Sequence, residues 1–66
     1  MNVAETLTKA AEDATTVTFA YNGEQRVLEV ELVTISGESE FVTGYDKNRE
    51  AIRRFTLSKI ENLEVI

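Results

Sequence analysis

Three arginines carry the clearest potential for binding chemistry in this chain: Arg26, Arg53 and Arg54. The planar guanidinium can give two parallel hydrogen bonds to phosphate or carboxylate oxygens, so converging arginines form a candidate site for an anionic ligand. The chain has a net charge of −5, and isolated positive charge in such a field would concentrate anion binding at one place. The alternative is a solvated surface on which the arginines pair weakly with nearby glutamates.

Strand alternation separates these arginines. In the segment 51–57, Arg53 shares a face with Phe55 and Leu57, whereas Arg54 points to the opposite face. Arg53 and Arg54 therefore cannot both enter one pocket from a regular strand.

Phe41 and Tyr45 are candidates for stacking on a nucleobase, as aromatic platforms do in proteins that bind single strands. The alternative is that one or both belong to the core. We expect Phe41 in the core and Tyr45 partly exposed. Any anion site should lie within 45–60, where basic residues outnumber acidic ones: Lys47, Arg49, Arg53, Arg54 and Lys59 against Asp46 and Glu50.

The residue types do not favour catalysis or metal binding. The chain has no histidine and no cysteine, so the usual zinc ligands and a nucleophile paired with a base are missing. The acidic residues do not follow the spacing of a calcium-binding loop. We expect a protein without catalytic activity, metal or cofactor.

A helix is predicted over residues 2–14. Asn2 and Glu5 have the spacing of a capping box, and apolar residues follow at helical spacing on one face. Strands are predicted over 17–21, 27–35, 40–45, 51–57 and 63–66. Asn22-Gly23 predicts a tight hairpin, and the consecutive apolar residues Leu32-Val33 predict a bulge in the long second strand.

The predicted fold is mainly β with one N-terminal helix: a five-stranded antiparallel Sm-like small barrel, formed as a single domain over residues 1–66. A chain this short has a small core, and open strand edges favour pairing with another copy. We expect a homodimer or a larger ring with the fourth or fifth strand at the seam. The predicted core consists of Leu7, Val17, Phe19, Leu28, Val30, Val42, Phe55, Leu57 and Ile60.

The sequence also bears on location. Its apolar stretches are far shorter than the ~20 residues that span a bilayer. The N-terminus has no basic start before an apolar run, as a signal peptide would. We expect a cytoplasmic protein that does not contact a membrane.

From residue 17 onward the sequence resembles the WYL domain family of bacterial regulators. The family's first strand ends in Tyr, followed by a glycine turn and Arg, as Tyr21, Gly23 and Arg26 are arranged here. The name-giving Trp-Tyr-Leu strand aligns with 40–42, where Glu40 and Phe41 replace Trp and Tyr. Two further runs are similar to family motifs: Gly44-Tyr45-Asp46 and Arg53-Arg54-Phe55-Thr56-Leu57-Ser58-Lys59-Ile60.

The resemblance implies a function. WYL modules are sensors of nucleotides, oligonucleotides or other anions, and they are usually attached to a DNA-binding domain. It implies here a stand-alone module that binds a nucleotide or short single-stranded nucleic acid and modulates a transcription or defence-related partner. The implied ligand-binding residues are Arg26, Phe41, Tyr45, Arg53 and Arg54. Because the family's arginine positions are kept at Arg26 and Arg53, the resemblance also implies that these two approach each other across neighbouring strands and hold an anionic group, with Tyr45 beside it.

A protein-interaction or inhibitor module is the alternative. It would use an open strand edge or an acidic face formed by Glu24, Glu29, Glu31, Glu38 and Glu40. Sequence-specific DNA binding is disfavoured, because the predicted helix is acidic and alanine-rich and does not resemble a recognition helix.

Overall fold

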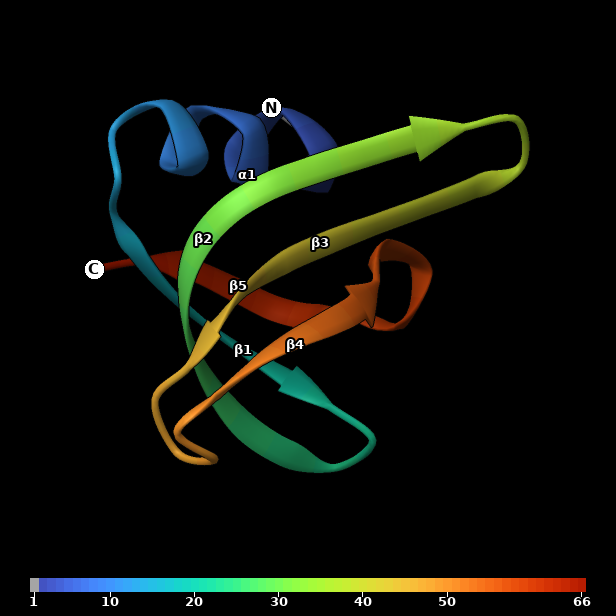
Figure 1. The fold of residues 1–66 in the computed structure, drawn as a ribbon. Helices are drawn as coiled ribbons and strands as arrows, with labels where there is room; N and C mark the ends of the chain where they lie inside the picture. Colours follow the sequence, from blue (N-terminus) through green and yellow to red (C-terminus); the bar gives the residue numbers. More distant parts are fainter. Residues whose placement is uncertain (1) are drawn as a thin grey trace.

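The computed structural model describes residues 2–66, which form an α-helix, five strands and a one-turn 3₁₀ helix. Figure 1 shows β2 (Glu24–Ser36) and β3 (Ser39–Asp46) as a long hairpin that extends beyond the rest of the sheet. No helix in the described part of the chain has the length and apolar character needed to cross a membrane. The elements are α1 (Val3–Glu12), β1 (Thr16–Tyr21), β2 (Glu24–Ser36), β3 (Ser39–Asp46), β4 (Ala51–Thr56), η1 (Leu57–Lys59) and β5 (Glu61–Val65).

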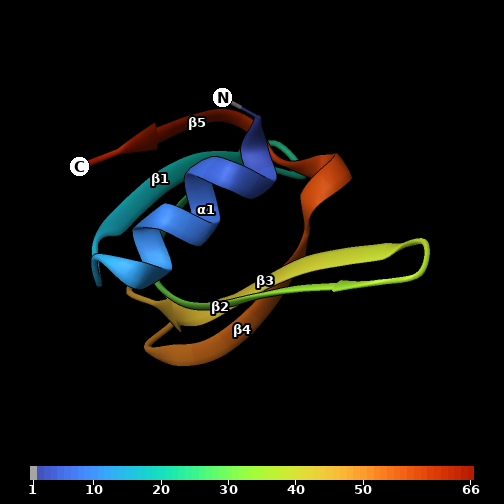
Figure 2. The same cartoon turned by 90° about the horizontal axis from the view of Figure 1, so that it is seen from above.

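The helix α1 begins at the predicted capping box. Asn2 Oδ1 accepts a hydrogen bond from the backbone N–H of Glu5 at 2.8 Å, and the Glu5 carboxylate accepts one from the Asn2 N–H at 3.5 Å. The helix ends two residues earlier than predicted, because Ala14 turns the chain with a φ of +54°. α1 packs mainly against β2, and Figure 2 shows it between β1 and β5 on one side and β2, β3 and β4 on the other.

The first two strands form the predicted tight hairpin. Asn22 and Gly23 have φ values of +53° and +78°, which are the left-handed conformations that a two-residue turn of this kind requires. The turn sets the register in which Phe19 pairs with Arg26 and Val17 pairs with Leu28.

The long strand β2 contains a bulge, one residue earlier than predicted. Val30 pairs with Gly44 and Leu32 pairs with Thr43, so Glu31 is the extra residue. The bulge bends the strand, as Figure 1 shows. Alternation restarts after it, and Leu32 faces outward with 58% of its surface exposed.

The strands form one antiparallel sheet in the order β4-β3-β2-β1-β5. This confirms a mainly β fold with one helix and a five-stranded antiparallel sheet. Closure into a barrel is not confirmed, because within residues 2–66 β4 pairs with β3 and β5 with β1, and these two edge strands are not hydrogen-bonded to each other. Figure 2 shows a curled, open sheet.

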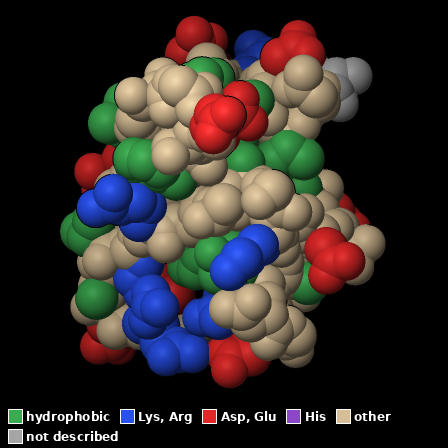
Figure 3. Space-filling model, turned by 90° about the vertical axis from the view of Figure 1, so that its right-hand side faces the viewer, with side chains coloured by type: hydrophobic (Ala, Val, Ile, Leu, Met, Phe, Trp, Pro, Cys, Tyr) green, Lys and Arg blue, Asp and Glu red, His purple; other side chains and the backbone are tan. Residues whose placement is uncertain are grey.

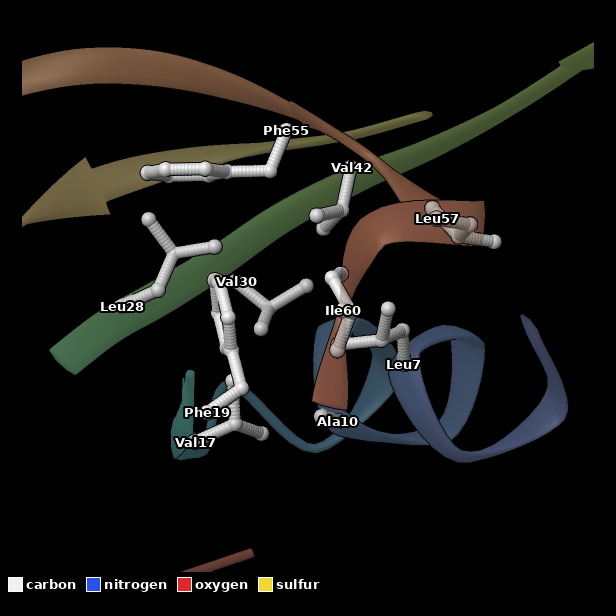
Figure 4. Close-up of a cluster of buried hydrophobic side chains, with 10 residues drawn as sticks. All are labelled: Leu7, Ala10, Val17, Phe19, Leu28, Val30, Val42, Phe55, Leu57 and Ile60. Atoms are coloured by element: carbon white, nitrogen blue, oxygen red, sulfur yellow. The ribbon is translucent and has the colours of Figure 1, made fainter. Parts of the chain in front are cut away.

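The core lies between the concave face of the sheet and α1, as Figure 4 shows. All nine residues predicted for it are buried, and Ala10 joins them. Three aromatic rings meet edge to face, with centroid distances of 5.2 Å between Phe19 and Phe55 and 4.9 Å between Tyr21 and Phe55. Phe41 does not belong to this cluster, so its assignment to the core was wrong.

Candidate functional site

The inner face of the sheet changes from apolar to charged toward the β1–β2 and β3–β4 turns. Leu28 on β2 pairs with Asp46 on β3, and Arg26, two residues before Leu28, points to the same face. Gly44 pairs with Arg53 on β4, so Arg53 also faces inward. We call Arg26, Asp46 and Arg53 the inner charged cluster.

Arg26 is almost fully buried, with 6% of its surface exposed. Its Nη2 donates a hydrogen bond to the Tyr21 carbonyl at 3.4 Å and lies 3.6 Å from Glu24 Oε2. Its Cζ lies 5.8 Å from the centroid of the Tyr21 ring and 5.6 Å from that of Phe55, within the range of cation–π attraction. Its Nε has no hydrogen-bond partner in the described chain.

Arg53 is half-buried and lies beside the same ring. Its Cζ is 5.9 Å from the Phe55 centroid, and no acidic side chain of residues 2–66 forms an ion pair with it. Gly44, opposite Arg53, has no room for a side chain, because a Cβ there would collide with the Glu29 carbonyl oxygen. Arg26 on β2 and Arg53 on β4 reach one ring from either side of β3, so the two arginines do not lie on neighbouring strands as predicted.

Asp46 was not predicted as a site residue, yet it is fully buried. Its Oδ1 accepts hydrogen bonds from the backbone N–H groups of Asn48 and Arg49 at 3.0 and 3.2 Å. This carboxylate therefore fixes the turn between β3 and β4, in the manner of an Asx turn. Its Oδ2 has no partner among residues 2–66. An Asp two residues before Asn in a predicted loop was the available signal for the turn, but nothing in the sequence signalled the burial.

Tyr21 also joins the site without having been predicted for it. Its hydroxyl oxygen accepts a hydrogen bond from the Thr56 N–H at 3.2 Å, which connects β1 to the end of β4. Burial raises the pKa of the phenol, but the hydrogen bonds with Thr56 and the positive charges of Lys59 and Arg26 together outweigh burial, and the pKa is lowered from its ordinary 10.0.

The other three predicted site residues lie on the outer face of the sheet. Arg54 lies over the ring of Phe41, with 4.6 Å between its Cζ and the ring centroid. Tyr45 is half-buried between Glu29 and Ile52 on the neighbouring strands. Because the outer face is opposite the inner charged cluster, Tyr45 does not flank Arg26 and Arg53 as predicted.

The rim of the inner charged cluster carries further charges. Arg49 Nη2 lies 2.8 Å from Glu24 Oε2, so one carboxylate meets both Arg49 and Arg26. In Figure 3 most of the Lys and Arg side chains on the face shown lie in its lower half, around a small patch of hydrophobic atoms. Within residues 2–66, no three acidic side chains lie close enough together to hold a metal ion.

Known proteins share this fold. Among solved structures, proteasome accessory factor B/C (PafBC) of Arthrobacter aurescens superposes with a TM-score of 0.83 at 15% sequence identity. The match covers 92% of this chain and 10% of that chain, so the chain spans about a tenth of the length of PafBC. No match is found among curated proteins. The family model of the WYL domain matches residues 2–65, which include α1 as well as the sheet, and the chain therefore belongs to the WYL domain family.

Proposed function

We propose that this chain is a non-catalytic sensor module that binds an anionic ligand at the inner charged cluster. The ligand class is a nucleotide or a short single-stranded nucleic acid. The observation that carries the proposal is the placement of two guanidiniums against one ring, since Arg26 and Arg53 lie 5.6 and 5.9 Å from the centroid of Phe55. The cluster contains no nucleophile with an adjacent base, which disfavours catalysis.

Arg53 is the arginine most available to a ligand. It is half-buried and has no acidic partner among residues 2–66, whereas Arg26 is held by Glu24 and the Tyr21 carbonyl. A phosphate at Arg53 would accept charge-assisted hydrogen bonds beside an apolar ring, where such bonds are stronger than in water. Arg53 therefore makes the main contact with the ligand, and Arg26 adds positive potential and one unpaired donor, Nε, behind it.

Family membership supports a regulatory setting for this binding. PafBC, which shares the fold, is by its name an accessory factor of the proteasome. The corresponding proposal for this chain is that ligand binding changes its contact with a separate partner in transcription or defence.

Substitution of Arg53 tests the site. Arg53→Gln should weaken binding of a mononucleotide or a short mixed-sequence oligonucleotide by about 1.5–3 kcal/mol, the range for a hydrogen bond to a charged group. The measurement is an NMR titration of the labelled chain at moderate salt, with amide shifts expected around Arg26 and Arg53.

The adjacent Arg54 provides a matched control, because it has the same side chain but lies on the outer face. Arg54→Gln and, on the helix, Lys9→Gln should leave the affinity unchanged within twofold. If no shifts cluster around Arg26 and Arg53 with any ligand in the panel, the sensor proposal fails and a protein-interaction function takes its place.

The outer face of the sheet favours that second function. Leu32 and Ile52 expose 58% and 57% of their surfaces there. The five glutamates of the predicted acidic face do not form one face, since Glu24 begins β2 and Glu38 lies in the turn beyond its other end. The interaction function therefore depends on the outer face and the strand edges, and a pull-down from the native host would identify its partner.

A further inference from the structure

The two edge strands of the open sheet carry opposite charges. β4 contains Arg53 and Arg54 and no acidic residue, whereas β5 contains Glu61 and Glu64 and no basic residue. None of these four side chains forms an ion pair within residues 2–66. Each edge therefore presents charge that the described chain leaves uncompensated.

The same strands also expose apolar side chains and backbone polar groups. Ile52 on β4 is 57% exposed and Val65 on β5 is 51% exposed. β4 pairs with β3 on one side, and β5 with β1 on one side. The outer N–H and C=O groups of both strands are available to a further strand, except the Thr56 N–H at the end of β4, which donates to the Tyr21 hydroxyl.

The two edges lie on opposite sides of the molecule. Figure 2 shows β5 at the top, above α1, and β4 at the bottom, below β2 and β3. The register of the sheet also places Arg54 on the same outer face as Glu61 and Glu64, because Glu64 pairs with Thr18 and Glu61 with Ala20, both of which face outward. A strand added to β4 with the sequence of β5 would therefore bring opposite charges together on one face.

We propose that this chain associates with a second copy of itself head to tail, with β4 of one copy pairing with β5 of the next. Pairing of β4 with β4 would place arginines against arginines, and pairing of β5 with β5 would place glutamates against glutamates. Only the mixed pairing is electrostatically matched. It leaves one free edge at each end, so the assembly grows into a ring or an open chain. This association does not depend on the anion site.

Sedimentation velocity of the full chain over a concentration series tests this association. As the protein concentration rises, the measured mass should rise from 7.4 kDa to multiples of that value. Added salt should lower the mass again, because the charges on the two edge strands are exposed and therefore screened. Arg54→Glu and Glu64→Arg should each raise the dissociation constant about tenfold, from lost attraction and new repulsion. Circular dichroism checks that both variants are folded.

An equimolar mixture of the two variants distinguishes the mixed pairing from the alternatives. Arg54→Glu keeps a native β5 edge and Glu64→Arg keeps a native β4 edge, so the mixture should regain association that each variant lacks alone. Lys9→Glu, with the same charge change on α1, should behave like the original chain. A single 7.4 kDa species at all concentrations, or equal association of Arg54→Glu and Lys9→Glu, would overturn the proposal, as would a mixture no better than its components.

Discussion

A buried arginine is stable where its charge and its N–H donors are satisfied. Arg26 meets a carbonyl, a carboxylate and two aromatic faces, yet its Nε has no partner in the described chain. Asp46, on the neighbouring strand, likewise leaves Oδ2 unpaired. Unpaired buried polar atoms cost free energy, and a bound ligand with complementary donors and acceptors would reduce this cost.

Tyr21 makes the stability of the folded chain depend on pH. Burial raises the pKa of its phenol, but the hydrogen bonds with Thr56 and the positive charges of Lys59 and Arg26 outweigh burial and lower the pKa below 10.0 in the folded protein. Between the folded pKa and about 10 the unfolded chain binds more protons than the folded one, so this group makes stability rise with pH in that window. Absorbance titration in a Tyr45→Phe background, where Tyr21 is the remaining tyrosine, should give a pKa below 10.0.

Urea unfolding at several pH values provides the second measurement. The stability difference between the original chain and Tyr21→Phe should grow as the pH rises toward 10. Arg26→Gln should raise the pKa of Tyr21, because it removes a positive charge. A phenol that titrates at or above 10.0 would contradict the account of its surroundings.

At the scale of elements, the sequence predicts turns and alternation well where local chemistry decides them. The turn at Asn22-Gly23 follows from the backbone preferences of these two residues alone. The bulge predicted at Leu32-Val33 lies at Glu31, the residue directly before that apolar pair. β3 was harder to interpret. Phe41 and Val42 are adjacent and cannot both face inward. In the sequence the side of the strand that carries Phe41 and Tyr45 looks apolar, but the structure buries the other side, which carries Val42, Gly44 and Asp46.

The site could be predicted only in part for a related reason. Alternation correctly separates Arg53 from Arg54, since both lie on one regular strand. The face on which Tyr45 lies depends on which side of β3 packs against the core, and the burial of Asp46 depends on three strands meeting. Both are properties of the assembled sheet and are not visible in any single segment.

The cap of α1 can be tested at this scale. Asn2→Ala removes the acceptor for the Glu5 N–H and should lower the free energy of unfolding by about 1 kcal/mol, the typical value for a lost N-cap. Thr8→Ala is a control, because the exposed Thr8 hydroxyl donates only to the Ala4 carbonyl within the helix. Urea unfolding measures both; equal stability of the two variants would show that the capping box does not stabilise α1.

The whole molecule depends on a small number of large side chains. Among residues 2–66, ten buried hydrophobic residues form the core, and two of the largest are Phe19 and Phe55. A core of this size supplies roughly 3–5 kcal/mol of net stability. Phe55 also contacts both arginines of the inner charged cluster, so the same ring stabilises the fold and positions the site.

Replacing Phe55 tests this dependence. Truncation of a buried Phe to Ala costs about 3–5 kcal/mol, which equals the whole expected stability, so Phe55→Ala should be largely unfolded at 25 °C. Phe41→Ala is the matched control: the same substitution on the outer face removes a half-buried ring and its contact with Arg54, and should cost about 1 kcal/mol. Circular dichroism and urea unfolding compare the two variants. A folded Phe55→Ala, or a Phe41→Ala that is the less stable of the pair, would mean that the inner and outer faces of the sheet are assigned wrongly.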